Sequence, residues 1–188
     1  MTELSVVFYR NMNLGHPGSP RRPALEKALT DAGGKAVRSF QTNGTVLFLA
    51  DDPRGVVDTA AVALRDVGYT EAGIVRPLRL LADLLGADPF EGFRDERTYR
   101  ETLTFYDADA PLPVDLPWNG PRDDLDLIAD SDGVVLGIIR QRGGSVGDPT
   151  GEVERMTGGV ATTRTLGTIQ RLLATASRAE DVAPRRGG

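Results

Sequence analysis

The stretch Ser5-Val-Val-Phe-Tyr-Arg10-Asn-Met-Asn-Leu14-Gly15-His16-Pro17-Gly18 decides the fold of this chain. Residues 4–9 are rich in β-branched and aromatic side chains, a composition typical of a largely buried strand. Polar and glycine residues follow at once, so we expect the strand to end in a loop that begins at Arg10. Many folds place a functional site in such a loop, which makes this loop the first candidate site.

The segments after this loop predict a βαββαβ unit. We expect a helix that ends at Gly33-Gly34, strands over residues 35–40 and 45–50 joined by a turn at Asn43-Gly44, a helix that begins at Asp52-Pro53, and a strand over residues 71–76. This order is that of a ferredoxin-like unit, an antiparallel sheet with both helices on one face.

A turn-rich connection at residues 88–93 divides the chain into two parts. We predict an N-terminal half over residues 1–87, a C-terminal α+β half over 88–178, and a disordered tail over 179–188. For the second half we expect a strand over 101–106, a proline-rich loop over 108–123, a hairpin of strands 125–129 and 134–141, a short helix over 148–156, and a last helix from about residue 163 to 176.

Composition excludes several classes of protein. The 188 residues carry a net charge of −5, which argues against a non-specific nucleic-acid binder. No apolar run is long enough for a membrane span, and the N-terminus lacks the pattern of a signal peptide, so we expect a cytoplasmic protein. The chain has no cysteine, and no ligand spacing supports a metal site, so no metal or other cofactor is predicted.

Four segments resemble the bacterial domain-of-unknown-function family 1697. That family opens with a strand ending in Leu-Arg-Gly-Ile-Asn-Val-Gly, with which Tyr9-Arg10-Asn11-Met12-Asn13-Leu14-Gly15 shares the arginine, the second asparagine and the last glycine. Its hairpin and its Asn-Pro-Phe connection are similar to residues 43–48 and to Asp88-Pro89-Phe90. Its C-terminal Thr-x-Arg-Asn-Trp-Asn-Thr is similar to residues 162–168, which keep Arg164 and Thr168.

The resemblance covers nearly the whole chain, and it identifies the chain as a divergent member of that family. It implies an α+β protein made of two ferredoxin-like halves with antiparallel sheets. The activity of the family is not established, so the resemblance implies no catalytic residue.

The candidate ligand site combines polar residues from three segments: Arg10, Asn11 and Asn13 after the first strand, Asn43, Gly44 and Thr45 in the hairpin turn, and Arg164 at the expected start of the last helix. A guanidinium with amides, glycine N–H groups and a helix N-terminus suits a carboxylate or phosphate. In the alternative interpretation, Arg10 pairs with an acidic residue and the asparagines satisfy the loop backbone.

Three further groups of residues are candidates for catalysis or binding. His16 is the only histidine and with Ser19 is the one conventional base–nucleophile pair, although its loop position is also that of an ordinary exposed residue. Asp123, Asp124 and Asp126 could act as acid–base carboxylates or form a polar strand entrance. Trp118 could be a stacking platform or pack its loop onto the second sheet.

The function that we expect is binding of a small anionic ligand or of a protein partner, without nucleic acid or membrane. An exposed sheet edge could also form a homodimer. The alternative is an enzyme that acts on a small metabolite in a biosynthetic pathway through polar loop residues, by positioning and acid–base chemistry.

Overall fold

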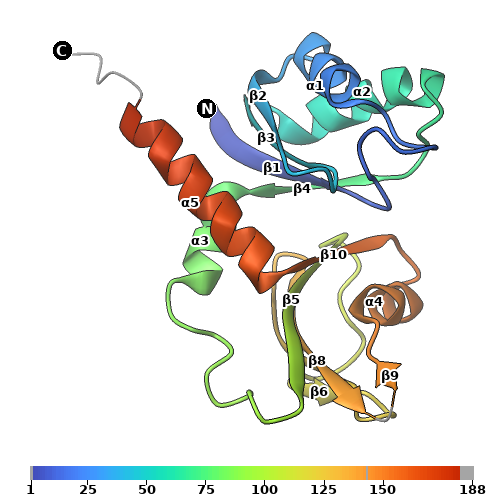
Figure 1. Cartoon of the computed structure of the whole chain (residues 1–188), viewed down its shortest axis with the longest axis vertical. Helices are drawn as coiled ribbons and strands as arrows, with labels where there is room; N and C mark the ends of the chain where they lie inside the picture. The colour runs from blue at the N-terminus through green and yellow to red at the C-terminus, as the bar shows by residue number, and fades with distance from the viewer. Residues whose placement is uncertain (1, 143, 183–188) are drawn as a thin grey trace.

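The computed structural model describes residues 2–142 and 144–182, and in these ranges each half of the chain builds one antiparallel sheet (Figure 1). The first half contains β1 (Glu3–Tyr9), α1 (Arg22–Asp31), β2 (Lys35–Phe40), β3 (Thr45–Ala50), α2 (Pro53–Asp66), β4 (Gly73–Pro77) and α3 (Leu78–Leu85). Its sheet has the order β2-β3-β1-β4, and α1 and α2 cover one face. The predicted βαββαβ element order is therefore present in this half.

The main strands of the second sheet have the same order as those of the first sheet, but the second half lacks the helix after its first strand. It contains β5 (Thr98–Tyr106), β6 (Trp118–Asn119), β7 (Leu125–Ser131), β8 (Val134–Arg142), β9 (Ser145–Val146), α4 (Pro149–Thr157), β10 (Ala161–Thr165) and α5 (Leu166–Val182). Its sheet has the order β10-β5-β8-β7-β6, and the predicted β7–β8 hairpin is confirmed. Because the proline-rich segment 107–117 forms no helix after β5, the expected βαββαβ order is wrong for this half.

The end of the chain also differs from the prediction. Ala161–Thr165 is not the start of a helix but β10, which pairs with β5, because its threonines favour a pleated strand. The last helix, α5, begins at Leu166 and continues to Val182, beyond the expected end of order at residue 178. The remaining part of the predicted disordered tail, residues 183–188, lies outside the described residues.

β1 is buried on both of its faces. Val7 and Tyr9 point into the core under α1 and α2, whereas Val6 and Phe8 point into a second core that contains residues of both halves. An antiparallel strand with one solvated face would alternate apolar and polar residues. The second half covers the face of β1 that α1 and α2 do not cover. Both faces are therefore buried, which accounts for the unbroken apolar run of β1.

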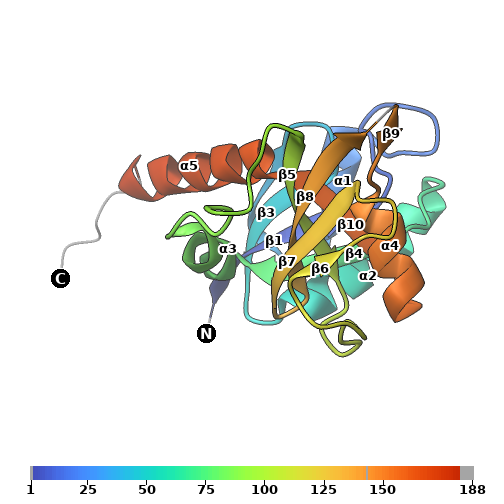
Figure 2. The same ribbon diagram turned by 90° about the horizontal axis from the view of Figure 1, so that it is seen from below.

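The shared core joins the two sheets. Phe8 of β1 stacks on Phe105 of β5, with ring centroids 3.8 Å apart and an interplanar angle of 14°. Leu81 of α3 and Ile169 of α5 belong to this core. Figure 2 shows these two helices at one side of the sheets. Since the core is continuous across the segment that joins the halves, the expected boundary near residue 87 separates two sheets rather than two independent cores.

The opposite face of the second sheet has a cover of its own. Val153 of α4, the side chain of Trp118 in β6, and Leu112 and Leu116 of the loop before β6 pack on it. No helix among the described residues is sufficiently long and apolar to cross a membrane.

The Phe8–Phe105 stack yields a test of the shared core. We expect Phe105→Ala to lower the free energy of unfolding by about 3–5 kcal/mol, because it leaves a cavity between the sheets. Urea denaturation followed by fluorescence and by circular dichroism would measure this loss. Tyr99→Ala, on the exposed start of the same strand, is the matched control and should cost about 0.5 kcal/mol or less. Separate unfolding transitions for the two halves would contradict a shared core.

Candidate functional site

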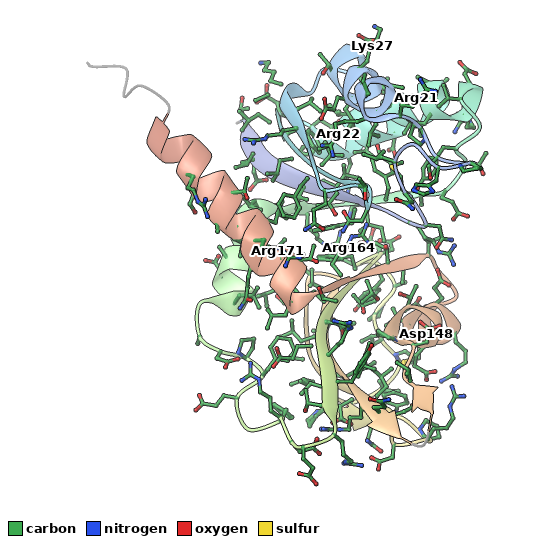
Figure 3. All side chains as sticks on the ribbon, viewed as in Figure 1. Arg21, Arg22, Lys27, Asp148, Arg164 and Arg171 are labelled. Atoms are coloured by element: carbon green, nitrogen blue, oxygen red, sulfur yellow. The ribbon has the colours of Figure 1, made fainter. Side chains whose placement is uncertain are left out.

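Arg164 is the centre of the predicted site, and it lies buried between the two halves (Figure 3). β10 places it on the face turned toward the first half, where its Nη2 donates to the carbonyl oxygens of Tyr9 at 2.9 Å and Asn43 at 2.7 Å. Its Nε donates to Thr45 Oγ1 at 3.2 Å, and its Nη1 donates to two atoms of β10 itself. A guanidinium has five N–H groups, so these five bonds leave no donor for a ligand.

The Arg164 cation has no carboxylate partner among the described residues. Its acceptors are neutral oxygens, and its guanidinium lies 5.6 Å from the centre of the Phe8 ring. Burial lowers the pKa of Arg164 to about 10, so the side chain is charged at neutral pH. This cation is stabilised by matched hydrogen bonds and by the aromatic face rather than by an opposite charge.

Arg10 joins the halves from the loop after β1. Its Nε and Nη2 donate to the two carboxylate oxygens of Glu154 in α4 at 2.7 and 3.1 Å, and its Nη1 donates to Glu71 at 3.2 Å. The hydrogen bonds to Glu154 raise the pKa of Arg10 and lower the pKa of Glu154. The Arg10 side chain is about 25% exposed, and the Glu154 carboxylate forms a bidentate pair with its guanidinium.

The other predicted site residues divide into two groups. Asn43, Gly44 and Thr45 lie against Arg164, and the Asn43 Oδ1 atom is buried without a hydrogen-bond partner. Gly44 has φ of +70°, and a side chain there would collide with Met12 and Tyr9. Asn11 and Asn13 are exposed, so the structure does not bring their side chains into the buried cluster.

Sequence reasoning missed two tyrosines in this cluster. Tyr69 donates from its hydroxyl to the Arg10 carbonyl oxygen at 2.6 Å, and its ring contacts Tyr9 edge to face at 5.7 Å. The Tyr9 hydroxyl is buried without a partner, and burial raises the pKa of both tyrosines above the usual value. Tyr69 follows a helix-ending glycine, a position that carries no signal of a contact with the first loop.

The remaining sequence candidates lie away from this cluster. His16 is exposed in a loop. Asp123 accepts from Arg97 at 2.6 Å and Asp126 accepts from Arg140 at 2.5 Å, so these carboxylates hold the far end of the second sheet. Trp118 packs onto the outer face of that sheet.

A second buried arginine crosses between the halves in the opposite direction. Arg76 of β4 is 4% exposed and donates to the carbonyl oxygens of Tyr106 and Gly133 in the second half. Its Nη1 donates to the Val75 carbonyl oxygen at 2.6 Å, but its Nε is buried without a hydrogen-bond partner. Burial lowers the pKa of Arg76, and the nearby positive charge of Arg54 lowers it further.

Two adjoining cavities along β4 form what we call the β4 groove. They share Arg54, Val75 and Arg76 and have volumes of about 520 and 340 Å³. Residues of both halves line each cavity, with Ala108 and Asp132 of the second half in the larger one and Asp107, Gly159 and Val160 in the smaller one. Ligand pockets are frequent at such junctions between two parts of a fold.

Some of the residues that line the β4 groove have polar side-chain groups without a hydrogen-bond or ion-pair partner among the described residues. Ser5 also lines the larger cavity, is 1% exposed, and has an Oγ atom without a hydrogen-bond partner. Arg54, in the first turn of α2, is exposed and forms no hydrogen bond or ion pair with any described residue. Unsatisfied buried polar atoms cost free energy, and in native proteins they mark either strain or a missing partner.

Sequence reasoning did not identify the β4 groove. Ser5, Arg54 and Arg76 lie in three different elements, and nothing in their spacing connects them. An arginine inside an otherwise apolar strand, as in Ile-Val-Arg-Pro, was the one available signal.

Comparison with known proteins gives a family and a fold. The model of a family described as "Protein of unknown function (DUF1697)" matches residues 1–116. The conserved bacterial protein SP0830 from Streptococcus pneumoniae has a similar solved structure, with 16% sequence identity, a TM-score of 0.59, and coverage of 93% of this chain and 98% of that chain. At this identity the likeness shows the fold alone, and it extends over both halves. No curated protein matches the chain.

Arg164 should be necessary for stability. We expect Arg164→Lys to lower the free energy of unfolding by about 2–4 kcal/mol, because an ammonium cannot satisfy the acceptors that face the five N–H groups. Thermal and urea denaturation would measure the loss. Arg171→Lys is the matched control, since Arg171 lies on the exposed side of α5 and should change stability by about 0.5 kcal/mol or less. Equal stability of the two variants would contradict this role.

The Arg10–Glu154 pair should make stability depend on pH. The folded protein holds the pKa of Glu154 below its usual value of 4.5, so the pair stabilises the fold above that pH and loses its effect as the pH falls through the lowered pKa. We therefore expect Glu154→Gln to destabilise the protein at pH 7 and to have a much smaller effect near pH 3, measured by urea denaturation at both pH values.

Glu152→Gln is the control for this measurement. Glu152 lies on the same helix, and its partner Arg155 is largely exposed, so the pair contributes little. A loss of stability in Glu154→Gln that is the same at both pH values would show that the carboxylate charge is not the cause.

Proposed function

Since this chain belongs to the DUF1697 family, whose description assigns no activity, we propose from its geometry that it binds a small ligand through an anionic group in the β4 groove. The observation that supports this proposal is that three residues whose side chains have polar groups without a described partner line the same cavity. Ser5 Oγ, Arg76 Nε and the whole guanidinium of Arg54 lack partners among the described residues, and all three residues line the larger cavity.

These groups suit a carboxylate or a phosphate. Two guanidinium groups and a hydroxyl supply charged and neutral donors, which together match the oxygens of such an anion. The larger cavity also includes Pro53 and Arg54 in the first turn of α2, whose N-terminus is capped by the Asp52 carboxylate. A carboxylate is the smaller of the two groups, so it is our preferred ligand group.

We assign a different role to the cluster around Arg10 and Arg164. The donors of Arg164 are saturated and the bidentate face of Arg10 holds Glu154, so this cluster connects the two halves. The anion site expected at the first loop therefore becomes, in our proposal, a structural junction. The groove that takes the ligand lies on the β4 side of the same junction.

Two finer expectations stay predictions. The first half has the strand order and helix placement of a ferredoxin-like unit, and we infer that fold for it alone. Homodimerisation through a sheet edge is not favoured at β2, because a register shift between Lys35 and Arg38 interrupts its pairing and both residues are exposed.

Arg54→Gln should separate ligand binding from stability. We expect acetate, succinate or inorganic phosphate at saturating concentration to raise the melting temperature of the native chain by about 5 °C, and Arg54→Gln to abolish that rise. The ligand-free melting temperature should stay within about 1 °C of the native value, because Arg54 has no partner to lose. Differential scanning fluorimetry would measure both.

Two variants control this experiment. Arg65→Gln, on the same helix but outside the groove, should retain the ligand-induced rise. Arg10→Ala should lower the ligand-free melting temperature and retain the rise. If Arg10→Ala instead abolishes the rise without loss of stability, the ligand binds at the first loop and our location is wrong.

A further inference from the structure

We infer that the ligand of the β4 groove is a short peptide with a free carboxylate and a free ammonium group, an inference that rests on the proposed anion site. The evidence is the distribution of charge in the groove and the open edge of β4. The distribution of charge favours a ligand with a positive charge as well as a negative one, and the open edge of β4 favours a ligand with peptide groups.

Carboxylates flank the two arginines on both sides. Asp132 and Asp83 line the larger cavity, and Asp58 and Asp107 line the smaller one, whereas Arg54 and Arg76 lie where the cavities meet. The side-chain carboxylates of Asp58, Asp83 and Asp132 form no hydrogen bond or ion pair with any described residue. Arg79 and Glu3 also line the larger cavity. They form an ion pair, with 2.9 Å between Arg79 Nε and Glu3 Oε1, so their charges compensate each other.

Because of this arrangement, a ligand that carries negative charge only binds more weakly than one that also carries a positive charge. An anion held by Arg54 and Arg76 would lie between unpaired aspartates on each side, and like charges at short distance repel. A ligand with an ammonium group a few bonds from its carboxylate pairs with both kinds of residue. Charge complementarity therefore selects a zwitterion.

The open edge of β4 favours a ligand with peptide groups. Arg10 N–H donates to the Ala72 carbonyl oxygen at 3.0 Å, so in the antiparallel register Gly73 and Val75 direct their N–H and C=O groups away from β1. Both residues line the groove, and one of these groups, the Val75 carbonyl oxygen, already accepts from Arg76. The other backbone groups are available to an extended peptide, as in strand addition to a sheet edge.

Triglycine and two capped derivatives test the inference by isothermal titration calorimetry on the full chain. We expect triglycine to bind, and N-acetyl-triglycine and triglycinamide each to bind at least about tenfold more weakly, because each lacks one of the two charges. Asp58→Asn and Asp132→Asn identify the aspartate that faces the ammonium group. One of these variants should weaken triglycine binding about tenfold and leave N-acetyl-triglycine binding unchanged.

The other outcomes overturn the inference in distinguishable ways. If N-acetyl-triglycine binds as tightly as triglycine, the ammonium group is not recognised, and the anion site alone remains. If triglycinamide binds as tightly as triglycine, the carboxylate is not recognised, and the proposed function fails as well. If neither triglycine nor its derivatives bind while acetate or phosphate does, the groove takes a simple anion and not a peptide.

Discussion

The arrangement of the two halves depends on the buried guanidinium of Arg164. Arg164 is only 9% exposed, and no carboxylate of the described residues pairs with it. Burial of such a cation is costly unless every N–H group has an acceptor. Three of its acceptors, the carbonyl oxygens of Tyr9 and Asn43 and the hydroxyl of Thr45, belong to the first half. The three acceptors reach Arg164 in β10 only when the two halves lie in this relative placement. In another placement the buried charge would lose hydrogen bonds, and this cost favours the observed placement.

Arg76 imposes the reciprocal requirement at the other edge of the junction. It extends from the first half to the carbonyl oxygens of Tyr106 and Gly133, while Arg164 extends from the second half to the first. Between them the stacked rings of Phe8 and Phe105 fill the shared core. Apolar packing supplies most of the stability of such an interface, and the two arginines fix its orientation.

The two crossings differ in one respect that concerns function. At Arg164 all donors are used, and the residues around it form a closed cluster. At Arg76 three of the five N–H groups have acceptors among the described residues, and its Nε is buried without one. Arg76, Ser5 and the exposed Arg54 all line the larger cavity of the β4 groove. An arginine whose N–H groups all donate to protein acceptors stabilises the fold. An arginine at a cavity whose N–H groups lack acceptors can bind a ligand. The local contacts, rather than the residue type, distinguish the two uses.

The sequence by itself determined the elements of the first half, the β7–β8 hairpin and the family, because these depend on local periodicity, turn chemistry and short motifs. It predicted Arg10 and Arg164 as ligand-binding residues, whereas we assign to both the role of joining the two halves. It did not determine that Arg164 lies in a strand, since Ala-Thr-Thr-Arg-Thr becomes a strand only by pairing with β5. Tertiary structure alone decided the partners of each charge. The Glu154 carboxylate pairs with Arg10, whereas no described residue pairs with Arg54. Arg10 and Glu154 lie far apart in the chain, and no local pattern connects them.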